Sequence, residues 1–281
     1  MKPFFRLMRL HQPVGIWLLL WPCWWSLALA SNGLPPLKLM ALYALGAIVM
    51  RSAGCIVNDI ADRNFDRQVE RTSTRPLASG EISLPQALAL LAILLSSGAA
   101  IAYSLGLTTF LWALASLPLV VSYPFMKRIS WWPQLFLGFT FNWGALMAWA
   151  TLRGHPEWPS ILLYIGGICW TLGYDTIYAH QDKKDDAKIG VKSTALRLGS
   201  KTKLALALFY GLSAASWALA GVFSPITIWY YFCLLLTITH FVWQIRAVTL
   251  DNPTSCRRFF LSNMTLGGIV FFACVAGKIS L

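Results

Sequence analysis

Charged residues are scarce in this chain. Asp, Glu, Lys and Arg make up 12% of its 281 residues, and hydrophobic residues make up 57%, whereas soluble domains carry about 25% charged residues. This composition excludes a soluble domain and indicates an integral membrane protein. Several apolar stretches approach the roughly 20 residues that cross the hydrocarbon core of a bilayer. They predict a single all-α domain over residues 1–281, built from about nine transmembrane helices near 14–31, 37–60, 85–104, 107–123, 132–151, 160–178, 204–221, 224–245 and 259–279.

Cysteine and histidine patterns that bind zinc are also lacking. The six cysteines are scattered, mostly through apolar segments, and no CxxC or Cys/His spacing occurs. The four histidines share no ligand spacing either. We therefore expect the cysteines to be apolar filling of the bundle and assign no histidine to a metal.

Acidic residues are nearly absent from one side of the predicted bundle. If the N-terminus lies in the cytoplasm, the outer side receives Lys38, Arg153 and Lys278 as its basic residues, and Arg51 lies within a span. An excess of Lys and Arg in inner loops is typical of a cytoplasmic face. Every acid except Glu157 also falls on the inner side. The net charge of +12 has three sources in this interpretation. Some basic residues fix the membrane topology, some contact anionic lipids of the bilayer, and the others form a binding site for a polyanion. Because the basic residues lie in short membrane loops, no nucleic-acid partner is expected.

Two rows of polar residues with a spacing of four follow apolar spans on this inner side. They are the first acidic row, Asn58, Asp62 and Asp66, and the second acidic row, Tyr178, Asp182 and Asp186. In a helix this spacing places a row on one face, with neighbouring members about 6 Å apart. Two carboxylates at that distance repel each other by roughly 2–3 kcal/mol at an effective dielectric constant of about 20. A divalent cation relieves this repulsion, and oxygen ligands favour Mg²⁺ or Ca²⁺ over zinc.

Basic residues are expected beside the two rows. Arg75, Lys127, Arg128 and Lys192 lie in loops on the same side, and Arg51 lies two turns before the first acidic row. A metal and several cations together form a clamp for a diphosphate. A long isoprenoid diphosphate is amphipathic, and an intramembrane cavity would shelter its tail and the allylic carbocation left when diphosphate departs. The order of span, acidic row and basic hydroxyl-rich loop occurs twice, which predicts a parallel internal repeat.

Two other membrane functions compete with this interpretation. A cation transporter should carry ionisable residues near mid-membrane and on both sides, whereas the acids here gather on one side. Cation flux in proteoliposomes without a prenyl donor would support that alternative. A phospholipid headgroup transferase should carry a single glycine-spaced acidic motif containing Ala-Arg, which this sequence does not contain.

The motifs around the rows are specific enough to suggest a family. Asn58-Asp59-x-x-Asp62-x-x-x-Asp66 and Asp175-x-x-Tyr178-x-x-x-Asp182-x-x-x-Asp186 resemble the two signature motifs of the UbiA superfamily of intramembrane prenyltransferases. Further segments are similar to the bacterial members that prenylate 4-hydroxybenzoate in ubiquinone biosynthesis. These segments are Leu7–Gly15, Leu20-Trp-Pro22, Arg71-Thr-x-x-Arg75-Pro-Leu-x-Ser-Gly80, Tyr123-Pro-Phe-Met-Lys-Arg128 and Gly190-x-Lys-Ser-Thr-Ala195.

The resemblance implies a helical bundle around a central cavity open to the cytoplasmic face, with Mg²⁺ as cofactor. It implies transfer of a polyprenyl group from a polyprenyl diphosphate to the ring carbon ortho to the hydroxyl of 4-hydroxybenzoate. Other aromatic acceptors, of the quinone-precursor, haem or chlorophyll type, remain alternatives. It also implies a multi-pass protein of the bacterial inner membrane, with the N-terminus and active-site loops in the cytoplasm.

The resemblance also implies roles for individual residues. The ligands of Mg²⁺ and diphosphate would be Asn58, Asp62, Asp66, Asp182 and Asp186. Further contacts to the diphosphate would come from Arg75, Lys127, Lys192, Arg51 and Tyr178, with Asp59 and Asp175 in support. Arg128 is predicted to bind the acceptor carboxylate, because a guanidinium pairs with a carboxylate through two hydrogen bonds. The base that removes the ring proton could be Asp182, Asp175 or the released diphosphate.

Overall fold

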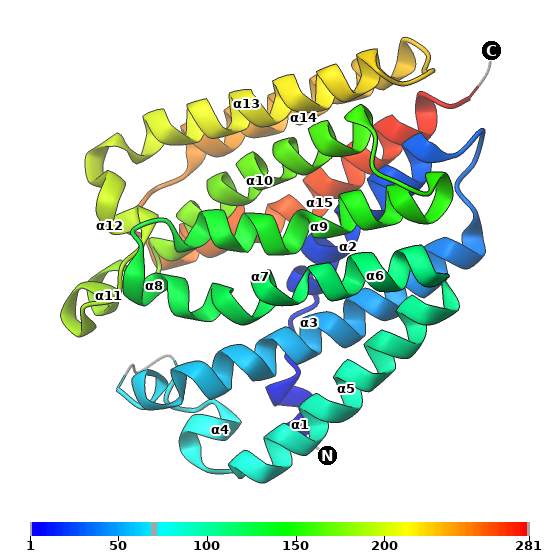
Figure 1. The fold of residues 1–281 in the computed structure, drawn as a ribbon. Helices are drawn as coiled ribbons and strands as arrows, with labels where there is room; N and C mark the ends of the chain where they lie inside the picture. The colour runs from blue at the N-terminus through cyan, green and yellow to red at the C-terminus, as the bar shows by residue number, and fades with distance from the viewer. Residues whose placement is uncertain (1, 69–71, 280–281) are drawn as a thin grey trace.

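The computed structural model describes residues 2–68 and 72–279, and all regular structure within these ranges is helical (Figure 1). The long helices are α2 (Val14–Ala30), α3 (Leu37–Asp66), α5 (Leu84–Ser104), α6 (Leu107–Ala115), α9 (Pro133–Arg153), α10 (Trp158–Ala179), α13 (Thr202–Val222), α14 (Trp229–Ala247) and α15 (Pro253–Ala276). The short ones are α1 (Lys2–Leu7), α4 (Pro76–Ser79), α7 (Leu117–Ser122), α8 (Met126–Ile129), α11 (Lys183–Ile189) and α12 (Thr194–Leu198). Two 3₁₀ turns, η1 (Tyr123–Phe125) and η2 (Gly199–Lys201), complete the set.

The predicted all-α membrane architecture is confirmed. In the described ranges, six helical segments are long and apolar enough to cross a membrane: Leu37–Asp66, Leu84–Ser104, Leu107–Ile129, Pro133–Arg153, Thr194–Val222 and Pro253–Ala276. The helix Val14–Ala30 is apolar but shorter. Each of the nine predicted segments is largely helical, whereas the number nine for the spans stays a prediction, as does the internal repeat.

Tryptophan packing joins the helices of the C-terminal half with α2. The indoles of Trp25 (α2), Trp170 (α10) and Trp217 (α13) are fully buried, with ring centroids 5.1–6.1 Å apart. Trp25 Nε1 donates to the Gly267 carbonyl of α15, and Trp170 Nε1 donates to Asn263 Oδ1 of the same helix. A buried indole N–H usually pairs with an acceptor, and these two hydrogen bonds join α2 and α10 to α15.

The other half of the bundle is less tightly packed. Here α5 packs on α3 and α6, and α6 packs on α9. These helices, with α2 and α7, surround an apolar chamber of about 390 Å³. On the outside of the bundle, large side chains such as Ile93, Leu204 and Leu235 are well over half exposed. Such exposure fits a surface covered by lipid tails rather than water.

The polar connections gather at one end of the bundle. Figure 1 shows α4, α8, α11 and α12 together at this end. Glycines end two of the short helices in the left-handed conformation, Gly80 after α4 (φ 85°) and Gly190 after α11 (φ 73°). Ser83 begins α5 with a capping box that includes Gln86. These stop and start signals bring the loops after α3 and α10 to the same place. Arg71, part of one predicted loop motif, lies outside the described residues.

Candidate functional site

A polar cavity of about 230 Å³ lies among these connections. Every member of both acidic rows lines it, although the rows are more than a hundred residues apart in sequence. The first acidic row comes from the last turns of α3, and the second comes from the end of α10 and from α11. The structure therefore brings together the residues that the spacing of four predicted on separate segments.

The carboxylates of the first acidic row are buried and paired with cations. Asp62 is 1% exposed and forms an ion pair with Lys127. Its other oxygen lies 3.5 Å from Arg128. Asp66 Oδ2 accepts a hydrogen bond from Arg75 at 2.7 Å. These ion pairs offset the repulsion that the spacing of the acids predicted.

Asp59 belongs to the same charge network but turns away from the cavity. Its carboxylate is 2% exposed and accepts from Arg9 at 2.5 Å and from Arg75 at 3.3 Å. Arg75 therefore bridges Asp59 and Asp66, which stabilises the end of α3. An offset of one residue from Asn58 rotates Asp59 about 100° around the helix, which explains why it does not line the cavity with the first acidic row.

Arg9 is a cavity residue to which the sequence assigned no role. It lines the polar cavity between the acidic rows and has a left-handed backbone, with φ of 53°, a conformation that costs energy for a non-glycine residue. Its place within the motif Leu7–Gly15 was the available signal. Because it lies on neither row, spacing alone did not connect it with the site.

The second acidic row is not carried by one continuous helix. α10 ends at Ala179, and Asp182 is the first residue before α11. The prediction that the spacing of four keeps the row on one helical face is correct for the first row and wrong for the second. Within the second row, Asp186 N donates to the Asp182 carbonyl at 2.8 Å, so Asp182, the N-cap of α11, lies one turn before Asp186. Tyr178 packs on Phe260, with 4.4 Å between ring centroids.

His180 holds the turn between α10 and α11. Its Nδ1 lies 2.9 Å from Asp251 Oδ1 and its Nε2 lies 3.2 Å from Thr202 Oγ1. Lys183 also donates to Asp251, at 3.0 Å. Burial lowers the pKa of His180, and the hydrogen bond from His180 lowers the pKa of Asp251. The turn before Asp182 is thus fixed to the α14–α15 loop and to α13.

Lys192 closes the cavity from the loop after α11. Its backbone N–H donates to the Lys127 carbonyl and its Nζ donates to the Ile129 carbonyl, both at 2.9 Å. These bonds tie the loop between α11 and α12 to α8. Lys127 and Lys192 therefore reach the cavity from adjoining segments, as the predicted diphosphate clamp requires.

Arg128 and Arg51 lie outside the lining of the polar cavity. Arg128 donates to the Ala61 carbonyl at 2.5 Å and stacks over the rings of Phe65 and Phe125. Arg51 lines the apolar chamber, with its guanidinium carbon 5.5 Å from the ring centre of Phe141. It makes no hydrogen bond or ion pair with another described residue.

The apolar chamber begins where the polar cavity ends. Tyr123 of η1 lines both. From there the chamber passes Arg51 and extends between α3, α5 and α6 to Tyr43 and Thr109. Tyr43 and Thr109 both hydrogen-bond Thr151, at 2.6 and 2.8 Å. A polar compartment and an apolar compartment thus meet at one tyrosine.

The donor set suits a hard cation held together with a phosphate ligand. In the described ranges, no three His, Cys, Asp or Glu side chains are grouped to bind a metal by themselves. Two of the candidate carboxylates, Asp62 and Asp66, are turned toward Lys127 and Arg75. Mg²⁺ requires few protein carboxylates when substrate phosphates and waters complete its coordination. The oxygen donors of the two acidic rows fit that mode of binding.

The sequence and fold place the chain among known proteins. The model of the UbiA prenyltransferase family matches residues 19–273. This chain belongs to the UbiA prenyltransferase family. The predicted resemblance is confirmed. A solved structure described as the apo form of a UbiA homologue from Aeropyrum pernix K1 superposes with a TM-score of 0.77 at 25% identity, covering 94% of this chain and 98% of that one. A UbiA homologue from Archaeoglobus fulgidus bound to GPP and Mg²⁺ shares the fold, with a TM-score of 0.68, 18% identity and coverage of 98% and 99%.

Three curated relatives are similar along nearly the whole chain. The mitochondrial 4-hydroxybenzoate polyprenyltransferase of Drosophila pseudoobscura pseudoobscura is 46% identical over 99% of this UbiA family member and 71% of its own length. The human mitochondrial 4-hydroxybenzoate polyprenyltransferase is 45% identical over 99% and 76%. The 4-hydroxybenzoate geranyltransferase 1 of Lithospermum erythrorhizon is 45% identical over 99% and 91%.

These relatives contradict the predicted bacterial inner membrane. The similar proteins of Drosophila pseudoobscura pseudoobscura, Dictyostelium discoideum, Arabidopsis thaliana and Homo sapiens are all named as mitochondrial, not bacterial. The charge asymmetry could not reveal this, because an excess of Lys and Arg sets the orientation of a membrane protein and not its compartment. The multi-pass membrane prediction itself agrees with the helices described above.

Proposed function

We propose that this protein transfers a polyprenyl group from a polyprenyl diphosphate to the ring carbon ortho to the hydroxyl of 4-hydroxybenzoate. The observation that carries the proposal is the meeting of the polar cavity, lined by both acidic rows, with the apolar chamber at Tyr123. A diphosphate head and an isoprenoid tail fit these two compartments respectively. The names of the relatives support the acceptor and the donor class, and the Archaeoglobus fulgidus homologue binds GPP and Mg²⁺.

The cavity residues would stabilise the leaving diphosphate. We assign Mg²⁺ ligation to Asn58, Asp62, Asp66, Asp182 and Asp186. The bound ion would supply electrostatic stabilisation of the departing oxygens. Arg75, Lys127, Lys192 and Arg9 line the cavity and contribute cations to the diphosphate, with Tyr178 beside them. The allylic carbon–oxygen bond breaks, and its electron pair leaves with the diphosphate.

The acceptor ring then attacks the allylic carbocation. A π-electron pair of the phenol ring forms the new carbon–carbon bond ortho to the hydroxyl, and the ring regains aromaticity by losing a proton from that carbon. Asp175 lines the cavity and makes no hydrogen bond or ion pair with another described residue. We propose it as the base, because its carboxylate is available and lies in the electrostatic field of Arg51 and Asp182.

Arg51 is better placed than Arg128 to bind the acceptor carboxylate. The guanidinium of Arg128 is occupied by Ala61 and by ion pairing with Asp62. Arg51 lies close to the junction of the two compartments and has no such partner among the described residues. A cation in an apolar chamber is costly unless anions join it. Arg51 interacts electrostatically with Asp175 but without a hydrogen bond, which leaves its guanidinium free to bind an anion directly. We infer that the carboxylate of 4-hydroxybenzoate supplies this anion.

Prenyl transfer is tested with purified protein, a labelled prenyl diphosphate and a panel of aromatic acceptors. We expect product with 4-hydroxybenzoate, no product after chelation of divalent cations, and recovery on addition of Mg²⁺. Asp62→Asn and Asp182→Asn should each lower kcat by at least about 10²-fold. Glu81→Gln, at an exposed ion pair with Arg6, is the matched control and should retain activity. Near-normal turnover by either aspartate variant would contradict the role of the acidic rows. Labelling of another acceptor alone would contradict the acceptor assignment but not the fold.

A further inference from the structure

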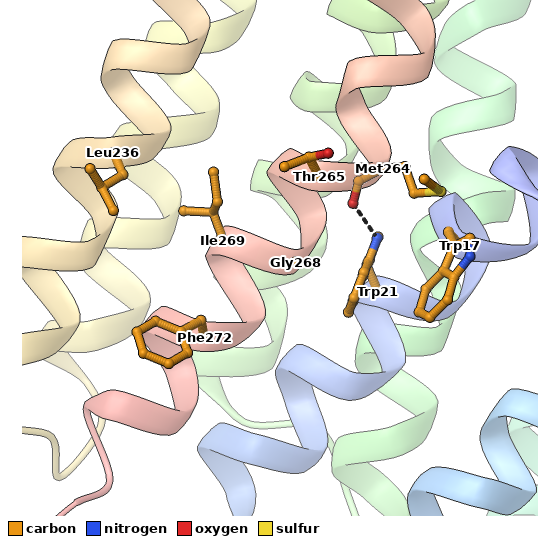
Figure 2. A pocket seen from close by; sticks show the side chains of 8 residues that line it. All are labelled: Trp17, Trp21, Leu236, Met264, Thr265, Gly268, Ile269 and Phe272. Carbon is orange, nitrogen blue, oxygen red and sulfur yellow. Dashed lines mark hydrogen bonds between the residues drawn. The ribbon is translucent and has the colours of Figure 1, made fainter.

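A third cavity, separate from the polar cavity and the apolar chamber, lies on the outer surface of the bundle. It is an apolar groove of about 480 Å³ between α2, α14 and α15. Its lining, drawn in Figure 2, is Trp17, Trp21, Leu236, Met264, Thr265, Gly268, Ile269 and Phe272. None of these residues lines the polar cavity or the apolar chamber. The groove faces outward, since Leu236 is 57% exposed and Phe272 is 63% exposed.

The groove runs along Gly268 of α15 beside the indoles of Trp17 and Trp21. Trp21 Nε1 donates to the Met264 carbonyl at 2.9 Å, as Figure 2 shows, and its ring stacks on Trp17 with 4.9 Å between centroids. Gly268 lies under the edge of Trp21, where an added Cβ would meet the ring at 3.4 Å. The absence of a side chain at Gly268 therefore keeps the middle of the groove open, and a larger residue there would fill it.

Two arginines lie at the polar end of the same helix. Arg257 is exposed and lies eleven residues before Gly268, a spacing that returns to within about 20° of the same face of α15. Arg258 is also exposed, and its guanidinium lies 6.0 Å from the ring centre of Trp243 on α14. The acid nearby in the chain, Asp251, is engaged by His180 and Lys183. The start of α15, beyond the groove lining, therefore carries uncompensated positive charge.

We propose that this groove binds an anionic glycerophospholipid of the surrounding bilayer. One acyl chain lies along α15 over Gly268, and the phosphate lies against Arg257 and Arg258. The distance from Arg257 to Gly268 along the helix is about 16 Å, which is close to half of the roughly 30 Å hydrocarbon core. An apolar groove at membrane depth excludes water, so a lipid chain is its natural filling. The paired arginines favour an anionic headgroup over a zwitterionic one.

Native mass spectrometry of the intact, detergent-purified chain tests this proposal. Phosphatidylglycerol and phosphatidylcholine with identical acyl chains are added separately, and retained lipid is measured at fixed collisional activation. We expect wild-type protein to retain one phosphatidylglycerol and about tenfold less phosphatidylcholine. Gly268→Leu should lower retention of phosphatidylglycerol by at least about tenfold, because it displaces several methylene groups. Arg257→Gln combined with Arg258→Gln should reduce phosphatidylglycerol to the level of phosphatidylcholine.

Matched controls separate the groove from general surface effects. Gly211→Leu adds the same side chain on the outward face of α13, where a Cβ would meet nothing within 4 Å beyond its own helix and chain neighbours. Lys201→Gln combined with Lys203→Gln removes two exposed cations at another helix end. Both controls should retain lipid as the wild type does.

Equal retention by Gly268→Leu and wild type would overturn the groove as the site. Equal binding of the two lipids would overturn the headgroup assignment. A dimer lost in Gly268→Leu, without lipid in the wild type, would assign the groove to a second copy instead.

Discussion

The acids in the last turns of α3 are partners of cations in the free protein. Asp62, Asp66 and Asp59 are buried, and each contacts at least one Lys or Arg. The carboxylates were identified from their spacing, which is a property of one helix. Lys127 and Arg9 come from segments 65 and 50 residues away from their partners, whereas Arg75 lies in the loop 9 residues after Asp66. Long flexible side chains choose partners by tertiary packing. The sequence therefore predicts which acids belong to this network, but it does not predict which cation pairs with each acid.

Loss of Asp59 should destabilise the fold more than loss of a surface acid. In Asp59→Ala, Arg9 and Arg75 lose a buried carboxylate, and we expect the free energy of unfolding to fall by about 3 kcal/mol. Asp185→Ala removes an exposed ion pair with Lys188 and should change the free energy of unfolding by less than about 1 kcal/mol. Unfolding in mixed micelles with increasing denaturing detergent measures both. Equal effects would show that the Asp59 network is no stronger than a surface pair.

A methyl group at Gly15 should weaken binding of the acceptor selectively. A Cβ at Gly15 would overlap the guanidinium of Arg51, whereas a Cβ at Gly54 would meet nothing within 4 Å apart from its own helix and chain neighbours. Arg51 is long enough to move aside, so the fold should tolerate Gly15→Ala. We expect KM for 4-hydroxybenzoate to rise about tenfold with an unchanged KM for the donor, and Gly54→Ala to match wild type. A rise in both KM values for Gly15→Ala would argue against Arg51 as the acceptor site.

At the scale of single elements, the two acidic rows differ although their spacing is the same. The first lies on the uninterrupted helix α3, which ends at Asp66. The second crosses a turn, because α10 ends at Ala179 and α11 begins at Lys183. Local spacing could not distinguish these cases. The turn depends on His180, Asp251 and Thr202, which meet only in the folded bundle.

The turn before Asp182 should be sensitive to His180. His180→Phe keeps most of the ring volume but removes one hydrogen bond from Asp251, which keeps Lys183, and one from Thr202, which keeps the Gly199 carbonyl. This loss should cost about 1–3 kcal/mol of stability. Asp182 should then be less well positioned, raising KM for the donor and the Mg²⁺ concentration needed for half-maximal rate. KM for the acceptor should not change. His155→Phe, on an exposed loop, is the control. If only stability falls, the histidine has no part in positioning Asp182.

At the scale of the whole molecule, the two halves of the bundle differ in packing. Buried tryptophans join α2, α10 and α13, whereas the helices α3, α5 and α6 enclose a chamber. Hydropathy predicted the helices and their membrane location but could not reveal this difference. Trp25 and Trp143 look alike in sequence, yet Trp25 is fully buried in the core and Trp143 lines the chamber.

Filling the chamber should change the preference for donor length. Gly46 lines the chamber twelve residues before Asn58, about 18 Å along α3 from the polar cavity. Gly46→Leu should lower kcat/KM for a long polyprenyl diphosphate about tenfold more than for geranyl diphosphate, whose tail does not reach this depth. Gly211→Leu on the lipid-facing side should alter neither value. Equal loss for both donors would indicate that the tail takes another route.

The pairing of the acidic rows with lysine and arginine has a thermodynamic consequence. In the proposed function, a metal ion that entered the cavity alone would compete with Lys127 and Arg75 for the same carboxylates, so we expect its affinity for the free protein to be low. A diphosphate brings negative charge that those cations can take instead, which releases carboxylate oxygens to the ion. We therefore expect positive coupling between the two ligands, and by reciprocity each would tighten the binding of the other by the same factor. Such coupling keeps the cavity electrically balanced in both its free and its loaded form.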